Sequence, residues 1–510
     1  MDLGSLMTRR ISIGFSWLLS WALLVTLAGG KETWIKADTE NFEIYSSASE
    51  AKSRALLEDL EQFRATLLKV MKLPPGHEPR TTIVLFDRAS DFERYQPLYQ
   101  GKPKEVSGYF SRGEDLAMMA LSPNTRDEDR VRRVIFHEYL HQLLATHGLA
   151  RIPVWLNEGL AEFFSTFQYE KGRAIIGRPL EAQLIFLNQV AWLPLQAVLA
   201  AKMDSPEYNE DFRNSVFYAQ AWALVHYLLC AKDTDYAPLL NRYLAQAAQP
   251  GQVAMPDFVD FTQIDVDDLA KRLRRYTKTG RYSPYKIDES AVRPNFTGNL
   301  VFSAPAAQEL DCVLALLAWR ARQAADSNYR LLELAEQMPD PTRAEEALGS
   351  IAWQQQDERS MREHWARAIA QGSTNAFIHR QLAVNQVTQI LNNRDPEYRL
   401  PEAMAMDLRT KLNRAVELDP DYADPLAWLA VVEAFAERPD IGNINRAQRS
   451  VAKQSDPRKL QLGLALVRWR LGDKTTPKVL AEELAKATDD PTIVYYAQWL
   501  KQQIEMQGRP

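Results

Sequence analysis

The chain has 510 residues, of which 46% are hydrophobic and 25% are charged. A chain of this length is too long for a single hydrophobic core, so we expect two or three domains. Its net charge of −5 at pH 7 leaves no basic excess and argues against a nucleic-acid partner. The two cysteines, Cys230 and Cys312, rule out a disulfide framework and a cysteine-ligated metal site. We expect both to be buried free thiols, and one disulfide between them is the alternative.

The first 30 residues have the composition of a targeting segment. Arg9 and Arg10 precede an apolar run, Ile11–Ala28, which ends in small residues before the charged Lys31. This order of positive, apolar and small residues is typical of a secretory signal peptide. The run is also long enough to stay uncleaved as a membrane anchor. We therefore expect an exported protein, periplasmic or secreted, that is attached to the inner membrane only if residues 1–30 are retained.

The region after the N-terminal segment alternates short apolar runs with one long amphipathic stretch. Phe42–Ser46 and Thr81–Phe86 are rich in β-branched and aromatic residues and predict strands. Between them, Glu50–Met71 has apolar residues at helical spacing and predicts a helix. Further along, Gly108–Phe110 and Leu116–Leu121 predict a hairpin.

A second long helix is expected next. Thr125 and Glu128 form the Thr-x-x-Glu capping box that begins a helix. Gly148, directly after His147, predicts the C-terminal end of this helix. The middle of the helix, which is its stiffest part, carries the most informative motif of the chain.

This motif is His-Glu-x-x-His. His137 and His141 are one helical turn apart, so both imidazoles lie on one face and can bind the same ion. A catalytic zinc takes three protein ligands and keeps one position for water. Glu138 lies beside the two histidines, so it is the natural general base for the zinc-bound water.

A further pair of carboxylates follows on another expected helix. This helix begins near Val154, after Pro153, and carries Glu158 and Glu162 at helical spacing. Either carboxylate can complete a set of two histidines and one glutamate. The residues alone leave open which one binds the metal, because both lie on the same helix face.

The two motifs together resemble those of the gluzincins, zinc metallopeptidases whose third ligand is a glutamate in an Asn-Glu-Gly-x-x-Asp/Glu sequence. Asn157-Glu158-Gly159 matches this pattern, and Glu162 stands at the position of the second acidic residue. The resemblance implies that Glu158 is the third zinc ligand. It also implies that Glu162 contacts a ligand histidine and fixes its tautomer.

The resemblance extends to the segment Ser215–Leu229. Aminopeptidase-like gluzincins carry a tyrosine there whose hydroxyl stabilises the oxyanion, and Tyr218 stands at that position. A core aromatic is the alternative for Tyr218. His226 is an alternative electrophilic donor, although a single histidine on an apolar helix is more often a core residue. We expect His77, His147, His364 and His379 to have structural roles.

Two departures separate the chain from the aminopeptidases. The 16 residues between His141 and Glu158 are fewer than those enzymes have. Their motif for binding a substrate amino terminus has no counterpart near Ala117–Ala120, which lacks a carboxylate. The order of a strand-rich start, two zinc helices and further helices from about 180 to 275 is similar to the peptidase-MA-like proteins, over residues 34–285.

The C-terminal part repeats itself after a Pro- and Gly-containing boundary at 283–305. One pair of positions recurs at intervals of 34 residues and then after an insertion: Leu314-Ala315, Leu348-Gly349, Leu382-Ala383 and Leu429-Ala430. A second register is marked by Ala335, Ala368, Ala415 and Ala452. This period resembles that of tetratricopeptide repeats, which implies helix pairs with a concave surface for a protein or peptide. A non-repetitive helical domain is the alternative.

The predicted fold is an α+β zincin-like (gluzincin) catalytic domain over residues 31–290, followed by an all-α tetratricopeptide-like domain over 300–510. The expected function is zinc-dependent hydrolysis of a peptide or protein substrate, with one Zn²⁺ per chain and a repeat module that binds protein. A scaffold that holds metal without turnover, and an exported repeat protein without metal, are the alternatives.

Overall fold

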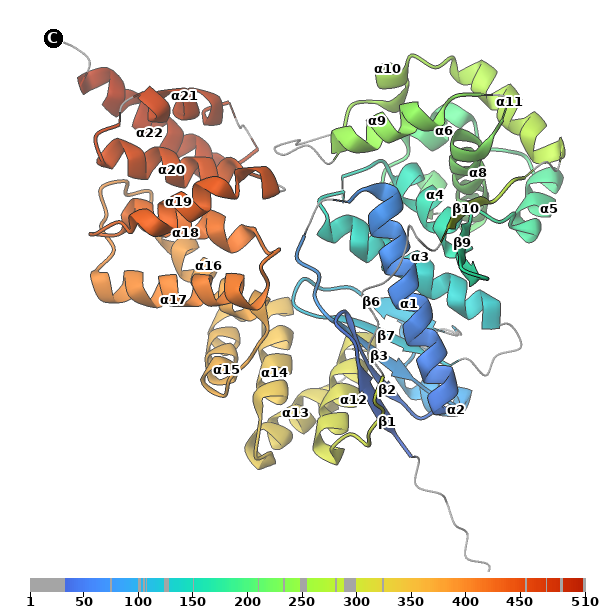
Figure 1. The fold of residues 1–510 in the computed structure, drawn as a ribbon, viewed down its shortest axis with the longest axis horizontal. Helices are drawn as coiled ribbons and strands as arrows, with labels where there is room; N and C mark the ends of the chain where they lie inside the picture. The colour runs from blue at the N-terminus through green and yellow to red at the C-terminus, as the bar shows by residue number, and fades with distance from the viewer. Residues whose placement is uncertain are drawn as a thin grey trace, which may run out of the picture. The chain divides into compact units, whose positions relative to one another are not determined.

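The central sheet of this computed structural model has five strands in the order β1-β2-β3-β7-β6 (Figure 1). They are β1 (Ile35–Asp38), β2 (Phe42–Ser46), β3 (Thr81–Leu85), β6 (Gly108–Ser111) and β7 (Ala117–Leu121). β2, β3 and β7 are parallel and wholly buried, as parallel strands covered on both faces must be. The two predicted strands and the antiparallel hairpin β6–β7 are confirmed. β1 was not predicted.

The structure describes residues 33–73, 76–99, 102–103, 106, 108–122, 128–149, 151–209, 211–232, 234–247, 255–279, 282–288, 300–322, 325–454, 456–473, 475–486 and 489–507. The predicted signal peptide or anchor, residues 1–30, and Thr125 of the predicted capping box lie outside these ranges. Among the helices described, none has both the length and the apolar composition that a membrane span requires.

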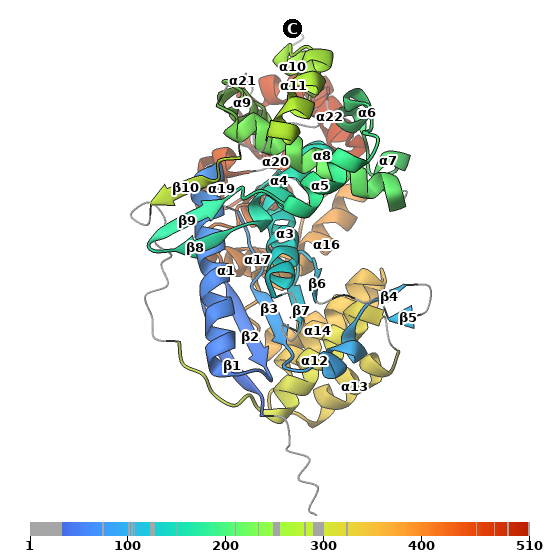
Figure 2. The ribbon, with the colours of Figure 1, turned by 90° about the vertical axis from the view of Figure 1, so that its right-hand side faces the viewer.

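Each face of the sheet is covered by helices from a different part of the chain (Figures 1 and 2). On one face, Ile44 and Met119 share a core with α1 (Glu50–Met71) and α3 (Glu128–Thr146). On the other face, Tyr45 and Met118 share a core with helices of the C-terminal region. Neighbouring residues of one strand therefore point into different cores, as the strand period of two requires.

The second half of the α+β region is mainly helical, as predicted. α3 ends at Thr146, two residues before Gly148, which has a φ of 78° and so takes the left-handed conformation that suits glycine. α4 (Val154–Ser165) begins at the expected position. The helices that follow are α5 (Glu181–Gln189), α6 (Leu195–Ala200), α7 (Pro206–Asn209), α8 (Asp211–Cys230), α9 (Ala237–Ala247), α10 (Phe258–Thr262) and α11 (Val266–Thr279).

A small antiparallel sheet in this region was not predicted. It consists of β8 (Gln168–Glu170), β9 (Arg173–Ile176) and β10 (Tyr285–Asp288), in the order β10-β9-β8. β10 falls in the stretch that we interpreted as a boundary. There the chain returns to pair with β9.

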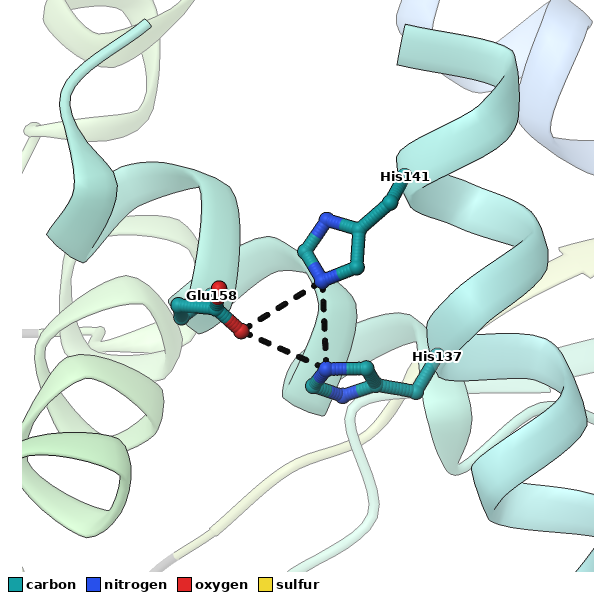
Figure 3. Close-up of side chains that lie close together, drawn as sticks. All are labelled: His137, His141 and Glu158. Atoms are coloured by element: carbon teal, nitrogen blue, oxygen red, sulfur yellow. Dashed lines mark hydrogen bonds and ion pairs between the residues drawn. The ribbon is translucent and has the colours of Figure 1, made fainter. Parts of the chain in front are cut away.

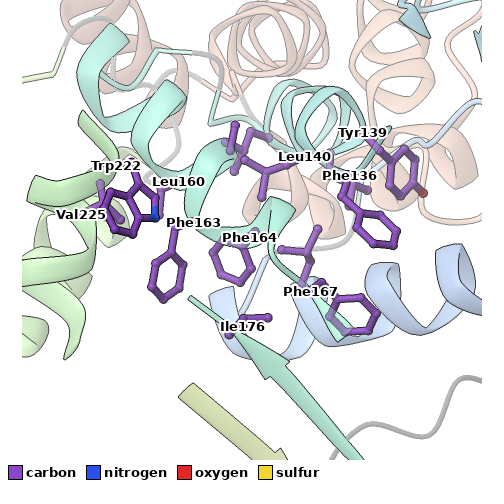
Figure 4. Close-up of a cluster of buried hydrophobic side chains, with 14 of the residues drawn as sticks. Phe136, Tyr139, Leu140, Leu160, Phe163, Phe164, Phe167, Ile176, Trp222 and Val225 are labelled. Atoms are coloured by element: carbon purple, nitrogen blue, oxygen red, sulfur yellow. The ribbon is translucent and has the colours of Figure 1, made fainter. Parts of the chain in front are cut away.

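α4 and α8 pack unusually closely at Gly159. A Cβ atom at this position would lie 2.5 Å from the carbonyl oxygen of Ala221 and 2.6 Å from Cγ2 of Val225. Apolar side chains of α3, α4 and α8 fill the space around this contact, including Leu140, Phe163 and Trp222 (Figure 4). The glycine of the Asn-Glu-Gly motif therefore lets the two helices approach, and this places Glu158 next to α8.

The C-terminal region is all-helical, as predicted. Its helices are α12 (Ala307–Arg322), α13 (Ala325–Gln337), α14 (Thr342–Gln354), α15 (Glu358–Ala370), α16 (Ala376–Asn392), α17 (Glu402–Leu418), α18 (Asp424–Phe435), α19 (Ile441–Arg449), α20 (Arg458–Arg470), α21 (Thr475–Leu484) and α22 (Pro491–Gln507). The recurring Leu-Ala/Gly pairs fall on α12, α14, α16 and α18. Three of the four second-register alanines fall on α13, α15 and α17, but Ala452 lies in a short 3₁₀ helix, Val451–Lys453. The arrangement is compatible with helical repeats.

Both cysteines are free thiols, which excludes the alternative disulfide. Cys312 is buried on α12, whereas Cys230, at the end of α8, is only half-buried rather than buried as expected. Burial raises the pKa of Cys230 to about 12 and that of Cys312 to about 11.

Charged contacts connect the first helices of the C-terminal region with the sheet and its β6–β7 loop. Nη2 of Arg320 on α12 donates to both carboxylate oxygens of Asp115, at 3.1 and 3.0 Å. The two side chains are 1% and 0% exposed. Nη2 of Arg343 on α14 also lies 2.6 Å from the carboxylate of Glu43 on β2. A buried pair such as Arg320–Asp115 holds its elements in one arrangement, because separating the charges would leave each of them unpaired in the core.

We predict that Asp115→Asn lowers the free energy of unfolding by about 3–5 kcal/mol, because the Arg320 guanidinium would be left buried without its counter-charge. Urea denaturation measures this change. The matched control is Glu363→Gln, which breaks the exposed pair with Arg359 (2.9 Å; 53% and 84% exposed) and should leave stability unchanged. Equal stabilities of the two variants would contradict the prediction.

Candidate metal centre

Three side chains from α3 and α4 converge on one point (Figure 3). Nε2 of His137 lies 3.2 Å from Nε2 of His141, and each lies 3.3 Å from Oε2 of Glu158. The two histidines are one turn apart on α3, and Glu158 faces them from α4. The three atoms therefore form a nearly equilateral triangle, and the group can hold a metal ion.

The dimensions and chemistry of this triangle fit a small divalent cation. Zinc bonds to His nitrogen and carboxylate oxygen are about 2.0–2.2 Å long and tetrahedral, which puts neighbouring ligand atoms roughly 3.3–3.5 Å apart. Oε2 of Glu158 is buried and has no hydrogen-bond partner among the described residues, although it faces both imidazoles. A bound cation would satisfy this oxygen.

The electrostatics of the group favour an ionised Glu158. Burial alone would raise the pKa of Glu158, but the adjacent His137 and His141 lower it well below its ordinary value. Burial would lower the pKa of His137, but Glu158 and Glu162 raise it overall. The carboxylate is therefore charged at neutral pH, which is the state that binds a cation.

Polar groups behind the histidines fix their orientation. Nδ1 of His141 lies 3.0 Å from Oδ1 of Asn157, an oxygen that can only accept a hydrogen bond. Nδ1 therefore carries the hydrogen, and the lone pair of Nε2 points to the centre of the triangle. Nδ1 of His137 lies 3.4 Å from Oε1 of Glu162, and Gln183 on α5 donates to the other oxygen of Glu162 at 3.0 Å.

The structure separates the two carboxylates of α4. Glu158 joins the triangle, and Glu162 lies behind His137. We did not predict that Asn157 contacts His141. Its position next to Glu158 in the Asn-Glu-Gly motif could have suggested a role at the site. Gln183, on a different helix, gave no signal in the sequence.

Glu138 and Tyr218 border the same group. Glu138 is half-buried on α3, and within the described ranges no hydrogen bond ties up its carboxylate. Its charge acts on both His137 and Tyr218, raising the pKa of each. The ring centres of Tyr218 and His137 are 6.3 Å apart. Burial first, and then the charge of Glu158, raise the pKa of Tyr218, so its hydroxyl is a hydrogen-bond donor at neutral pH.

A second tyrosine at the site was missed by the sequence analysis. The hydroxyl of Tyr208, on α7, donates a hydrogen bond to Oε1 of Glu158 at 3.0 Å. The hydroxyl of Tyr218 donates to that of Tyr208 at 3.5 Å. The polar sequence around Tyr208 gave no sign of this role, since the contact joins residues 50 positions apart.

The other histidines are outside the group, as expected. His226 is 0% exposed, with Nε2 2.8 Å from the carbonyl oxygen of Gly177 and Nδ1 2.8 Å from the hydroxyl of Tyr276. It is a satisfied core residue, not an electrophilic donor. His77, His147, His364 and His379 contact Asp419, Glu78, Glu345 and the carbonyl of Ser373, respectively.

Residues 133–249 match a protein family described as "Protein of unknown function (DUF1570)". The match extends from α3 to α9 and includes all the side chains of the metal centre. No curated protein matches the chain.

We predict that the purified protein binds about one divalent metal ion per chain and that His141→Gln abolishes this binding, because it removes one corner of the triangle. Metal analysis after dialysis measures the stoichiometry, and added metal should raise the melting temperature of the wild type but not that of His141→Gln. The control His379→Gln alters a histidine of the C-terminal helical region, and it should keep the metal and be stabilised by it like the wild type. Equal metal content in wild type and His141→Gln would show that these side chains do not bind it.

A separate prediction concerns His226 and acid stability. Burial lowers the pKa of His226 to about 4, below the ordinary value of about 6.5 that applies to the unfolded chain. Between these values the unfolded state binds more protons, so His226 contributes a stability loss of about 3 kcal/mol as the pH falls from 6.5 to 4. Urea denaturation with a chelator present, from pH 7.5 to 4.5, should show a smaller loss for His226→Gln than for the wild type. Parallel pH curves would refute this assignment.

Proposed function

We propose that the protein is an exported zinc-dependent peptide-bond hydrolase of the gluzincin type, with His137, His141 and Glu158 as the zinc ligands. The observation that carries this proposal is the triangle of two imidazole nitrogens and one carboxylate oxygen, with a further carboxylate, Glu138, beside it. Two histidines and a glutamate are a common ligand set of catalytic zinc. Imidazole also binds other transition metals, and metal analysis distinguishes them.

The chemistry divides between the metal and the side chains. Bound zinc would supply Lewis acidity and make water more acidic. Glu138 takes the proton of the attacking water and gives it to the leaving amine, because no other described residue forms a hydrogen bond with its carboxylate. Tyr218, protonated at neutral pH, gives up its hydrogen bond to Tyr208 and donates instead to the oxyanion that forms on the substrate carbonyl. Asn157 and Glu162 keep the two imidazoles in the orientation that binds metal.

The rest of the chain supports this activity in our proposal. Residues 1–30 direct export to the periplasm or the medium, or keep the protein at the inner membrane if they are retained. Residues 31–290 form the peptidase domain. Residues 300–510 form a tetratricopeptide-like module that recruits a protein or peptide through its helical repeats. A metal-holding scaffold without turnover is the alternative, and the retention of Glu138 favours the enzyme.

We predict that Glu138→Gln binds zinc like the wild type but lowers kcat by about 10²–10⁴-fold, because Gln cannot accept the proton of water. Digestion of a peptide library, followed by mass spectrometry, measures the activity. The control Glu181→Gln changes an exposed glutamate on α5 and should retain full activity. Zinc binding without any cleavage by the wild type would support the scaffold, and full activity of Glu138→Gln would exclude it as the base.

A further inference from the structure

The two oxygens of Glu158 have different surroundings. Oε2 faces the imidazoles of His137 and His141 at 3.3 Å. Oε1 accepts the hydrogen bond from the hydroxyl of Tyr208 at 3.0 Å. The carboxylate is therefore held with Oε2 toward the proposed metal position and with Oε1 hydrogen-bonded to Tyr208.

The position of Tyr208 is set by its own packing. Its ring meets Phe217 of α8 edge-on, with ring centres 5.8 Å apart, and Phe217 is 0% exposed. Its backbone N–H donates to the carbonyl of Ser205 at 3.1 Å. The hydroxyl therefore reaches Glu158 from α7, whose position is set by its packing against α8.

Tyr208 also connects Glu158 with Tyr218. The hydroxyl of Tyr218 donates to the hydroxyl of Tyr208, which donates to Glu158. The two rings lie 6.0 Å apart. Tyr208 thus holds the carboxylate on one side and the hydroxyl of Tyr218 on the other.

We propose that Tyr208 is a positioning residue that keeps Glu158 as a one-oxygen metal ligand and holds the Tyr218 hydroxyl beside it. This inference rests on the proposed metal centre. Carboxylates bind cations through one oxygen or through both. Without the Tyr208 hydroxyl, Oε1 is free to turn toward the metal, which raises the coordination number and disturbs the orientation of the ligand. Hydrogen bonds to ligand side chains typically change metal affinity by 10–100-fold.

Tyr208→Phe tests this role, because it keeps the ring that packs on Phe217 and removes only the hydroxyl. Competition with a chromogenic chelator should show Zn²⁺ binding about tenfold weaker than in the wild type. With Co²⁺ in place of zinc, the visible absorption should weaken, since tetrahedral Co²⁺ absorbs more strongly than Co²⁺ with more ligands. A merely structural tyrosine would not change this spectrum.

Two further variants serve as controls. Tyr243→Phe removes a buried hydroxyl on α9 that donates to the carbonyl of Pro256 at 2.8 Å, and it should keep both the Zn²⁺ affinity and the Co²⁺ spectrum. Tyr218→Phe should lower peptide cleavage but keep the Co²⁺ spectrum of the wild type.

The outcomes separate this inference from the proposed function. A wild type that binds neither Zn²⁺ nor Co²⁺ would overturn the metal centre itself. A wild type that binds both, with a Tyr208→Phe variant of the same affinity and spectrum, would overturn the role of Tyr208 and leave the metal centre intact. An equal change in Zn²⁺ affinity and Co²⁺ spectrum in Tyr208→Phe and Tyr243→Phe would also overturn the role of Tyr208. Loss of any buried tyrosine hydroxyl would then be enough to cause the change.

Discussion

A buried carboxylate is stable only if other groups replace the hydrogen bonds that it made with water. At Glu158, groups from several helices of the α+β region meet this requirement. The residue is 5% exposed on a helix whose other buried side chains include Trp155, Leu160 and Phe163. An ionised group in such surroundings is stable only if it is paired and hydrogen-bonded. Two imidazoles and one phenol surround it, yet Oε2 still lacks a hydrogen bond from any of the described residues. A cation at the centre of the triangle would complete the pairing.

A series of polar contacts connects the C-terminal helical region with the end of α3. Nδ1 of His77 lies 2.6 Å from Asp419, at the end of α17, and its ring stacks on Tyr422 with centres 3.9 Å apart. The next residue, Glu78, accepts a hydrogen bond from Nε2 of His147, just beyond α3, at 2.9 Å and is also bound by Arg64 of α1. The C-terminal helices therefore contact the segment that holds the end of α3, the helix that carries both histidines.

Much of this arrangement could be predicted because it depends on local sequence. The spacing of apolar residues gave both ends of α1, and the spacing of His137 and His141 placed both imidazoles on one face. The short strands β1, β8 and β10, of four, three and four residues, were missed because so few residues carry no clear periodicity. β10 depends in addition on pairing with β9, a strand that is distant in the sequence.

The sequence could not show whether Glu158 or Glu162 joins the triangle. This depends on how α4 is oriented against α3, and the spacing of residues along one helix does not contain that information. The contribution of Tyr208 depends on the path of the chain between α6 and α8.

The family match covers residues 133–249. It includes most of α3 and all of α4, α7 and α8, and so every side chain that forms or orients the triangle. It includes neither the central sheet nor the C-terminal helices. The remaining parts act on the site through packing. The edge strand β6 contacts α3 through Phe110 and Tyr139, whose ring centres are 6.4 Å apart. α1 contacts α3 through Phe63 and Phe136, whose ring centres are 4.4 Å apart. This packing suits a metal site. If the ligand atoms already lie at tetrahedral spacing before an ion binds, they need to move little when it does.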